Sequence, residues 1–159
     1  MEPLVALSIR QPWMDLIIRG VKTMEIRSWR VQRRGLIALH APRRIDFSAA
    51  YFYGYKNPWT MLRGKIIAVA EIVEVINLDT QSWIEFVSMH RQPLPLLEGS
   101  YGVLLKNVRP LENPVVCRGR QMLFPLAEDV AARVRKQAGL TTNSLEAVDE
   151  QNAQGEFFD

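Results

Sequence analysis

The segment KIIAVAEIVEVI, residues 65–76, decides the fold, because it is apolar on nearly both of its faces. A strand with one solvated face alternates apolar and polar side chains, since successive residues point to opposite sides of the sheet. A long strand covered on both sides instead fits a small barrel with helices packed outside it. We therefore predict that residues 65–76 form a central strand of such a barrel.

The segments before this strand predict a helix and two shorter strands. Residues 12–19 are apolar along one helical face, and Gly20 stands where a left-handed C-terminal cap is expected. Residues 33–35 predict a hairpin-like turn into a strand at residues 36–40. The strand before that turn, residues 23–29, alternates polar and apolar, and its polar face carries Thr23, Glu25 and Arg27.

The middle of the chain predicts two further helices and a loop rich in aromatic residues. Residues 46–52 favour a short helix capped by Asp46 or Ser48. Five of the 14 aromatic residues fall within residues 51–59, on a predicted loop where they either rim a cleft or pack back onto the body. A helix is expected after Asp79, with an apolar face formed by Trp83, Phe86, Val87 and His90.

The last third predicts two strand regions and a helix. Residues 101–109 read as a strand closed by Pro110, and residues 114–117 and 121–124 as a final hairpin. Residues 126–138 predict a helix with acids at its start and bases at its end. Antiparallel strands dominate this order of elements, so we predict an α+β fold.

The composition predicts one domain and an acidic tail. The chain has 159 residues, of which 48% are apolar, enough for one packed core. Residues 1–140 hold 20 basic and 12 acidic side chains, whereas residues 141–159 hold five acidic side chains and no Lys or Arg. We therefore expect a globular domain over residues 1–140 and a disordered tail over residues 141–159.

Several functional classes lack support in the sequence. No apolar run approaches the roughly 20 residues that span a bilayer, and the N-terminus lacks the pattern of a signal peptide, so we expect a cytoplasmic protein without a membrane partner. One cysteine, Cys117, and two distant histidines provide no metal-ligand spacing. Glycine-rich nucleotide motifs are absent too, and we predict no metal and no cofactor.

Basic side chains concentrate between residues 10 and 44. This segment holds nine Lys and Arg against two acids, and 15 of the 20 basic residues in the chain are Arg. Arginine suits bidentate contacts to phosphate and stacking on flat rings. The segment is therefore either a solvated face or an anion-binding surface.

Three motifs in the same third of the chain resemble the signature of the ASCH domain: SIRQPW at residues 8–13, GxKTxExRSW at residues 20–29, and RGxIxxHA at residues 34–41. This resemblance implies the PUA-like superfold, a small, partly open antiparallel β-barrel flanked by helices. It also implies a cleft lined by the GxKxxExR segment. Members of the family are linked to RNA binding, to transcription coactivation in eukaryotes and, in two branches, to hydrolysis of N4-acetylcytidine or RNA.

The main hypothesis is a nucleic-acid-binding domain that takes RNA, or a single-stranded or modified nucleotide, in preference to DNA. Arginines of the basic segment would contact phosphates, and a tryptophan would stack on a base. Trp13 has core packing as its alternative role, and a hydrogen bond from His40 would orient the cleft. The candidate binding residues are Arg10, Gln11, Trp13, Lys22, Glu25, Arg27, Trp29, Arg30, Arg33, Arg34 and His40.

The alternative hypothesis is a metal-independent hydrolase that acts on a modified nucleoside or on RNA. Lys22 and Glu25 would then be catalytic; their other interpretation is an ion pair at the surface. The amidohydrolases of the family carry Thr at the position of Glu25, and here Thr23 is the candidate hydroxyl.

The acidic tail has its own candidate roles. Phe157 and Phe158 could form a docking peptide for a protein partner or could pack on the body of the same chain, and the acids of the tail could compete for the basic surface. The sequence leaves the oligomeric state open.

Overall fold

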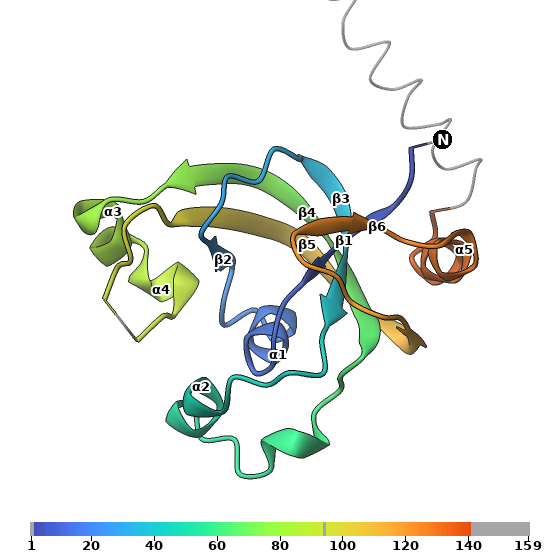
Figure 1. Ribbon diagram of the computed structural model, residues 1–159, viewed down its shortest axis with the longest axis horizontal. Coiled ribbons are helices and arrows are strands. Elements are labelled where there is room, and N and C mark those ends of the chain that lie inside the picture. Colours follow the sequence, from blue (N-terminus) through green and yellow to red (C-terminus); the bar gives the residue numbers. More distant parts are fainter. Residues whose placement is uncertain (1, 94, 141–159) are drawn as a thin grey trace, which may run out of the picture.

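The computed structural model describes residues 2–93 and 95–140. Six strands form one curled sheet, a half-barrel, in the order β2-β5-β4-β3-β1-β6 (Figure 1). The pair β1 and β3 is parallel, and the other pairs are antiparallel. The strands are β1 (Val5–Ser8), β2 (Met24–Arg27), β3 (Gly35–Ala41), β4 (Lys65–Asn77), β5 (Tyr101–Val116) and β6 (Leu123–Pro125). This architecture confirms the predicted α+β, partly open barrel.

Helices flank the half-barrel. They are α1 (Trp13–Ile18), α2 (Phe47–Phe52), the 3₁₀ turn η1 (Pro58–Thr60), α3 (Thr80–Glu85), α4 (Val87–His90) and α5 (Glu128–Gln137). Two hydrophobic clusters cover the two faces of β4, one including residues of α1 and the other residues of α5. The two-sided burial of β4 holds for residues 66–70, whereas Val73 and Glu74 are exposed.

Local sequence signals account for several of these elements. Helix α1 stops before Gly20, which has φ +75°, as the predicted left-handed cap requires. Asp46 caps α2 by accepting a hydrogen bond from the Ala49 amide. Asp79 and Ser82 form a capping box at the start of α3.

The predicted strand pairing is wrong in two places. Strand β2 does not form a hairpin with β3, because it pairs with β5 instead. The expected hairpin near the C-terminus is also absent from the described residues: β6 pairs with β1, so residues 117–122 cross from β5 to the far edge of the sheet. In both places the tertiary pairing partner is distant in sequence, and local turn signals do not report it.

Two predicted element boundaries also need correction. Pro110 does not end its strand, because β5 continues to Val116. Proline lacks an N–H for the ladder and is tolerated at bulges, and the register with β4 shifts on both sides of Ala68, the partner of Pro110. The helix expected after Asp79 breaks at Phe86 into α3 and α4. The predicted tail, residues 141–159, lies outside the described residues.

Candidate functional site

The opening of the half-barrel is bridged by one arginine. Strand β2 lies at one edge of the sheet and β1 is four places away in the strand order, yet the curl of the sheet brings their ends together (Figure 1). Across this opening, Nη2 of Arg27 donates to the backbone oxygen of Ser8 at 2.5 Å. The GxKxxExR segment therefore meets the SIRQPW segment at the mouth of the barrel.

Lys22 lies between α1 and β2 and is fully buried, with 1% of its surface exposed. Its Nζ donates to the backbone oxygen of His90 at 2.6 Å, lies 3.5 Å from Oε1 of Glu25, and sits 4.8 Å from the ring centre of Trp13. Burial lowers the pKa of Lys22, and the Glu25 carboxylate opposes that shift. These contacts tie helix α4 and helix α1 to the start of β2.

Glu25 is buried as well, with 4% of its surface exposed, and lies between two cations. Its Oε2 is 3.2 Å from Nη2 of Arg27, and its Oε1 accepts from the Ile26 amide at 2.9 Å. Burial by itself would raise the pKa of Glu25, but the charges of Lys22 and Arg27 hold that pKa below its usual value. Glu25 is therefore ionised at neutral pH, in a buried ion pair rather than the surface pair considered from sequence.

A serine and a histidine continue this network on the β1 side. The Nε2 of His40 is 2.7 Å from the backbone oxygen of Cys117, and its Nδ1 is 3.0 Å from Oγ of Ser8. Because a carbonyl oxygen can only accept, Nε2 carries the proton and Nδ1 accepts from the Ser8 hydroxyl. Burial lowers the pKa of His40, which keeps the ring neutral. These two hydrogen bonds fix the orientation of the His40 ring beside Ser8.

Gly119 packs directly on this pair. A Cβ at Gly119 would lie 2.5 Å from Cε1 of His40 and 3.2 Å from Oγ of Ser8. Only glycine fits there, so the segment between β5 and β6 sits against the His40 ring with Arg118 and Arg120 on either side. Sequence reasoning took this segment for a hairpin turn and missed its place at the site. The available signal was a glycine between two arginines.

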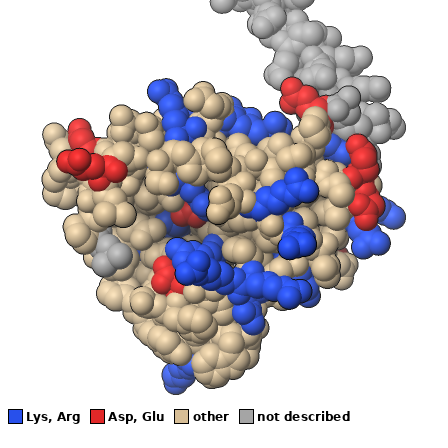
Figure 2. Space-filling view, viewed as in Figure 1, with Lys and Arg blue, Asp and Glu red and all other residues tan. Residues whose placement is uncertain are grey.

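Exposed basic residues gather at the edge of the sheet where β1, β3 and β5 end. The register places Ser8 beside His40 and Ala41 beside Lys65, which in turn pairs with Val116. We call the exposed arginines that follow these strand ends the basic edge: Arg10, Arg43, Arg44, Arg118 and Arg120. None of them forms an ion pair with a carboxylate among residues 2–93 and 95–140. Figure 2 shows basic side chains gathered around a hollow near the middle of the view.

The rest of the predicted basic segment lies elsewhere. Arg33 and Arg34 precede β3 and are therefore at its opposite end from Arg43 and Arg44. Arg33 approaches Glu2 at 3.9 Å, and Arg34 pairs with Glu74 at 3.4 Å. Strand β3 thus divides a segment that is continuous in sequence between two ends of the sheet. Arg30 is exposed on the connection between β2 and β3.

The remaining predicted residues are largely built into the body. Trp13 is 6% exposed and its Nε1 donates to Asp46. Trp29 is partly buried against the core. Gln11 is buried, with its amide bonded to the Leu62 oxygen and the Asp15 amide. Thr23 is partly buried, and its backbone bonds to Met89 and Leu105.

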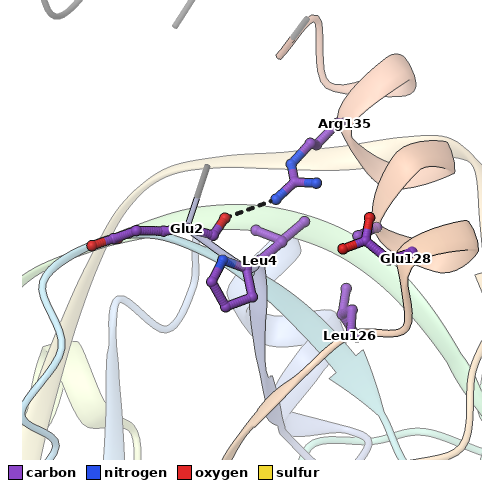
Figure 3. Close-up of a pocket in the computed structure, with 7 residues that line it drawn as sticks. Glu2, Leu4, Leu126, Glu128 and Arg135 are labelled. Carbon is purple, nitrogen blue, oxygen red and sulfur yellow. Dashed lines mark hydrogen bonds between the residues drawn. The ribbon is translucent and has the colours of Figure 1, made fainter. Parts of the chain in front are cut away.

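A separate pocket of about 320 Å³ lies between the N-terminal segment and helix α5 (Figure 3). Arg135 closes one side of it by donating from Nη2 to the backbone oxygen of Glu2 at 3.1 Å. Leu4 and Leu126 form its apolar wall, and Glu128 adds a carboxylate. None of the candidate binding residues lines this pocket, so it is distinct from the mouth of the barrel.

Two further properties of the described part of the chain bear on function. It contains no group of three or more His, Cys, Asp or Glu side chains placed to hold a metal ion. None of its helices combines the length and the apolar character that a membrane crossing demands.

The fold and the motif spacing of the site define a class of small PUA-like domains, and the comparisons identify the family. The ASCH domain model matches residues 7–115, so the chain belongs to the ASCH domain family. The comparison with curated proteins found no match.

Solved structures agree on the fold. An ASCH protein from Zymomonas mobilis is 14% identical, with a TM-score of 0.58 over 84% of this chain and 94% of that one. A tyrosine-to-phenylalanine mutant of ZmASCH from the same organism is 14% identical, with a TM-score of 0.61 over 85% of this chain and 98% of that one. A serine-to-alanine mutant of ZmASCH is 15% identical, with a TM-score of 0.57 and the same coverage. At these identities the likeness supports the fold alone.

Proposed function

We propose that this ASCH domain binds nucleic acid at the mouth of its half-barrel, with an unpaired RNA strand or a modified nucleotide as its ligand. The observation that carries the proposal is the basic edge. Its five arginines have no carboxylate partner among the described residues. They follow the ends of strands on the same side as the opening that Arg27 bridges. Arginines without carboxylate partners at one rim are suited to hold successive phosphates. RNA is favoured because members of the ASCH family are linked to RNA binding, and sequence-specific RNA readers mostly take unpaired nucleotides.

The buried network gives Arg27 a fixed position in this proposal. Glu25 holds one side of its guanidinium, and Lys22 and the Ile26 amide hold Glu25 in turn. The Nε of Arg27 is buried and has no hydrogen-bond partner among the described residues. The Arg27 side chain as a whole is 22% exposed, and this exposed part of the guanidinium is suited to donate to a bound phosphate or base. Lys22 and Glu25 then act as positioning residues.

Binding to a fluorescein-labelled 20-nucleotide RNA, measured by anisotropy over a salt series, tests the proposal. The logarithm of the affinity should fall linearly with the logarithm of salt concentration, with a slope of about −0.7 for each phosphate neutralised. Arg118→Gln and Arg120→Gln should each weaken binding and make the slope shallower by about 0.7. Arg133→Gln, an exposed arginine on α5, is the matched control and should change neither.

Two results would overturn the proposal. One is the lack of any binding to RNA or to DNA of the same sequence at low salt. The other is an affinity that does not depend on salt. Arg33→Gln and Arg34→Gln test whether the arginines at the opposite end of β3 also contribute.

A second candidate function is metal-independent hydrolysis of an N4-acetylcytidine-type nucleoside or of RNA. The observation in its favour is the buried Lys22 amine, whose lowered pKa beside Glu25 is a feature of general acid and base pairs. Turnover in EDTA that is lost in Glu25→Gln, while the variant remains folded by circular dichroism, would support it. Turnover that persists in purified Glu25→Gln and Thr23→Val would exclude these residues as the catalytic ones.

A further inference from the structure

Helix α2 and the turn η1 expose an unusual number of large apolar side chains. These two elements form a lobe away from the sheet (Figure 1). We call the exposed apolar side chains of this lobe and of the residues directly after η1, each between 47% and 65% exposed, the α2–η1 surface: Phe47, Tyr51, Phe52, Trp59 and Leu62. Single exposed apolar residues are common, but a group of this size marks a binding surface.

Basic side chains outnumber acids in the stretch of chain that forms this surface. Residues 42–70 contain five Lys and Arg and one acid, Asp46. Both carboxylate oxygens of Asp46 are engaged, Oδ1 by the Ala49 amide and Oδ2 by Nε1 of Trp13. Figure 2 shows the lobe, at the bottom of the view, as mainly uncharged surface with basic side chains and a smaller acidic patch along its upper border. The surface therefore suits an anionic partner.

Arginines lie beside the rings of this surface. The rings of Phe47 and Tyr51 are stacked, with centroids 6.5 Å apart and planes at 26°. Arg63 donates to the backbone oxygens of Trp59 and Arg43, at 3.1 and 2.9 Å, which holds η1 beside the segment that leads into α2. Arg43 and Arg44 belong to the basic edge and shortly precede α2, so the two surfaces are continuous.

A groove of about 480 Å³ adjoins the lobe. Its lining includes the apolar side chains of Ile18, Met61 and Leu62 and the polar side chains of Lys56 and Asn57. Asp15 adds one carboxylate, which pairs with Arg19 at 3.7 Å and accepts a hydrogen bond from the Tyr55 hydroxyl. Leu62 thus belongs both to the groove and to the α2–η1 surface. The groove extends the surface towards α1 and adds a further lysine.

We propose that the α2–η1 surface is a stacking platform for the bases of an unpaired nucleic-acid strand whose phosphates lie on the basic edge. The exposed rings lie next to arginines that can hold phosphates, and base–aromatic stacking tolerates any sequence. The inference rests on the proposed nucleic-acid binding and adds a second surface to it. The bound nucleic-acid strand then runs from the mouth of the barrel along the basic edge to α2.

The test uses the full chain, a labelled 20-nucleotide oligo(U) and its duplex with oligo(A). Trp59→Ala, and separately the double variant Phe47→Ala/Tyr51→Ala, should weaken binding of oligo(U) roughly tenfold, within the range for stacked bases, and should leave binding of the duplex unchanged. Neither variant should change the salt slope, because no cation is removed. Trp59→Phe should keep most of the affinity. The matched control is Ile84→Ala on α3, a side chain that is 67% exposed outside the surface and should have no effect.

The outcomes separate this inference from the proposed function. If the wild type binds oligo(U) and both Trp59→Ala and Phe47→Ala/Tyr51→Ala bind it with equal affinity, the platform is overturned and the basic edge remains in place. Absence of binding by the wild type would overturn both. A dimer that is seen in sedimentation of the wild type and is lost in Trp59→Ala would show that a second copy covers the surface, which also overturns the platform.

Discussion

Glu25→Gln removes a buried charge with almost no change in the shape of the side chain, so we expect it to lower the stability of the fold strongly. It leaves Lys22 and Arg27 facing each other without the carboxylate between them, and the Lys22 side chain is fully buried. Removing one partner of a buried ion pair costs about 3–5 kcal/mol, because the other charge stays buried and unpaired. For a domain of this size the melting temperature should fall by roughly 10 °C.

The same carboxylate gives the prediction a pH signature. The folded pKa of Glu25 lies below its unfolded value, so its contribution to stability is complete above about pH 4.3 and is lost as the pH falls through the folded pKa. Glu25→Gln should therefore lose less stability than the wild type on acidification across this window.

Urea unfolding followed by circular dichroism, at neutral pH and in the acid range, measures both effects. Glu74→Gln is the matched control, because Glu74 forms an exposed ion pair with Arg34 and should contribute about 0–1 kcal/mol. A cost for Glu25→Gln no larger than that of Glu74→Gln would refute the buried pair as a stabilising element.

Three other perturbations test the packing, the histidines and the tail. Gly119→Ala should destabilise the chain by about 1–3 kcal/mol and weaken RNA binding, because the added Cβ meets a His40 ring held by two hydrogen bonds. Thermal melts measure the stability and anisotropy the binding, and an unchanged melting temperature would contradict this packing. Burial lowers the pKa of both His40 and His90. On acidification these histidines therefore bind protons at a higher pH in the unfolded chain than in the folded one, and stability should decline as the pH falls below about 6.5. The decline in melting temperature between about pH 7.5 and pH 5.5 should be smaller in His40→Gln/His90→Gln, and an equal decline would show that other groups cause it. Deletion of residues 141–159 should raise RNA affinity at low salt if the acidic tail competes for the basic edge, whereas an unchanged affinity would rule out that competition.

Periodicity predicted the elements whose residues interact locally. The helix over residues 12–19 and the strand over residues 65–76 both appear near their expected bounds, because apolar spacing and a capping glycine specify them within a few residues. Pro110 misled the prediction, because a change of register in the partner strand is invisible in the sequence of β5. The motif spacing identified the family, and the family implied most of what we predicted about the barrel.

The geometry of the site could be predicted from the sequence only in part. The burial of Lys22 depends on a carbonyl 68 residues away, and charged side chains are usually exposed, so an exposed pair was the natural expectation. The basic segment was expected to act as one surface, but the seven-residue strand β3 places Arg33 and Arg34 at one end of the sheet and Arg43 and Arg44 at the other. Arg118 and Arg120 join the site only because β6 pairs with β1.

The two edge strands of the half-barrel also bear on how this chain avoids joining other sheets. An open sheet ends in unpaired backbone groups, and these can recruit a strand from another molecule. Here β2 is four residues long and carries Glu25 and Arg27, while β6 is three residues long and ends in Pro125, which has no N–H to donate. Short, charged or proline-ended edges offer few registers for strand addition. An incomplete barrel can thus keep its mouth open to a ligand without presenting an edge that favours aggregation.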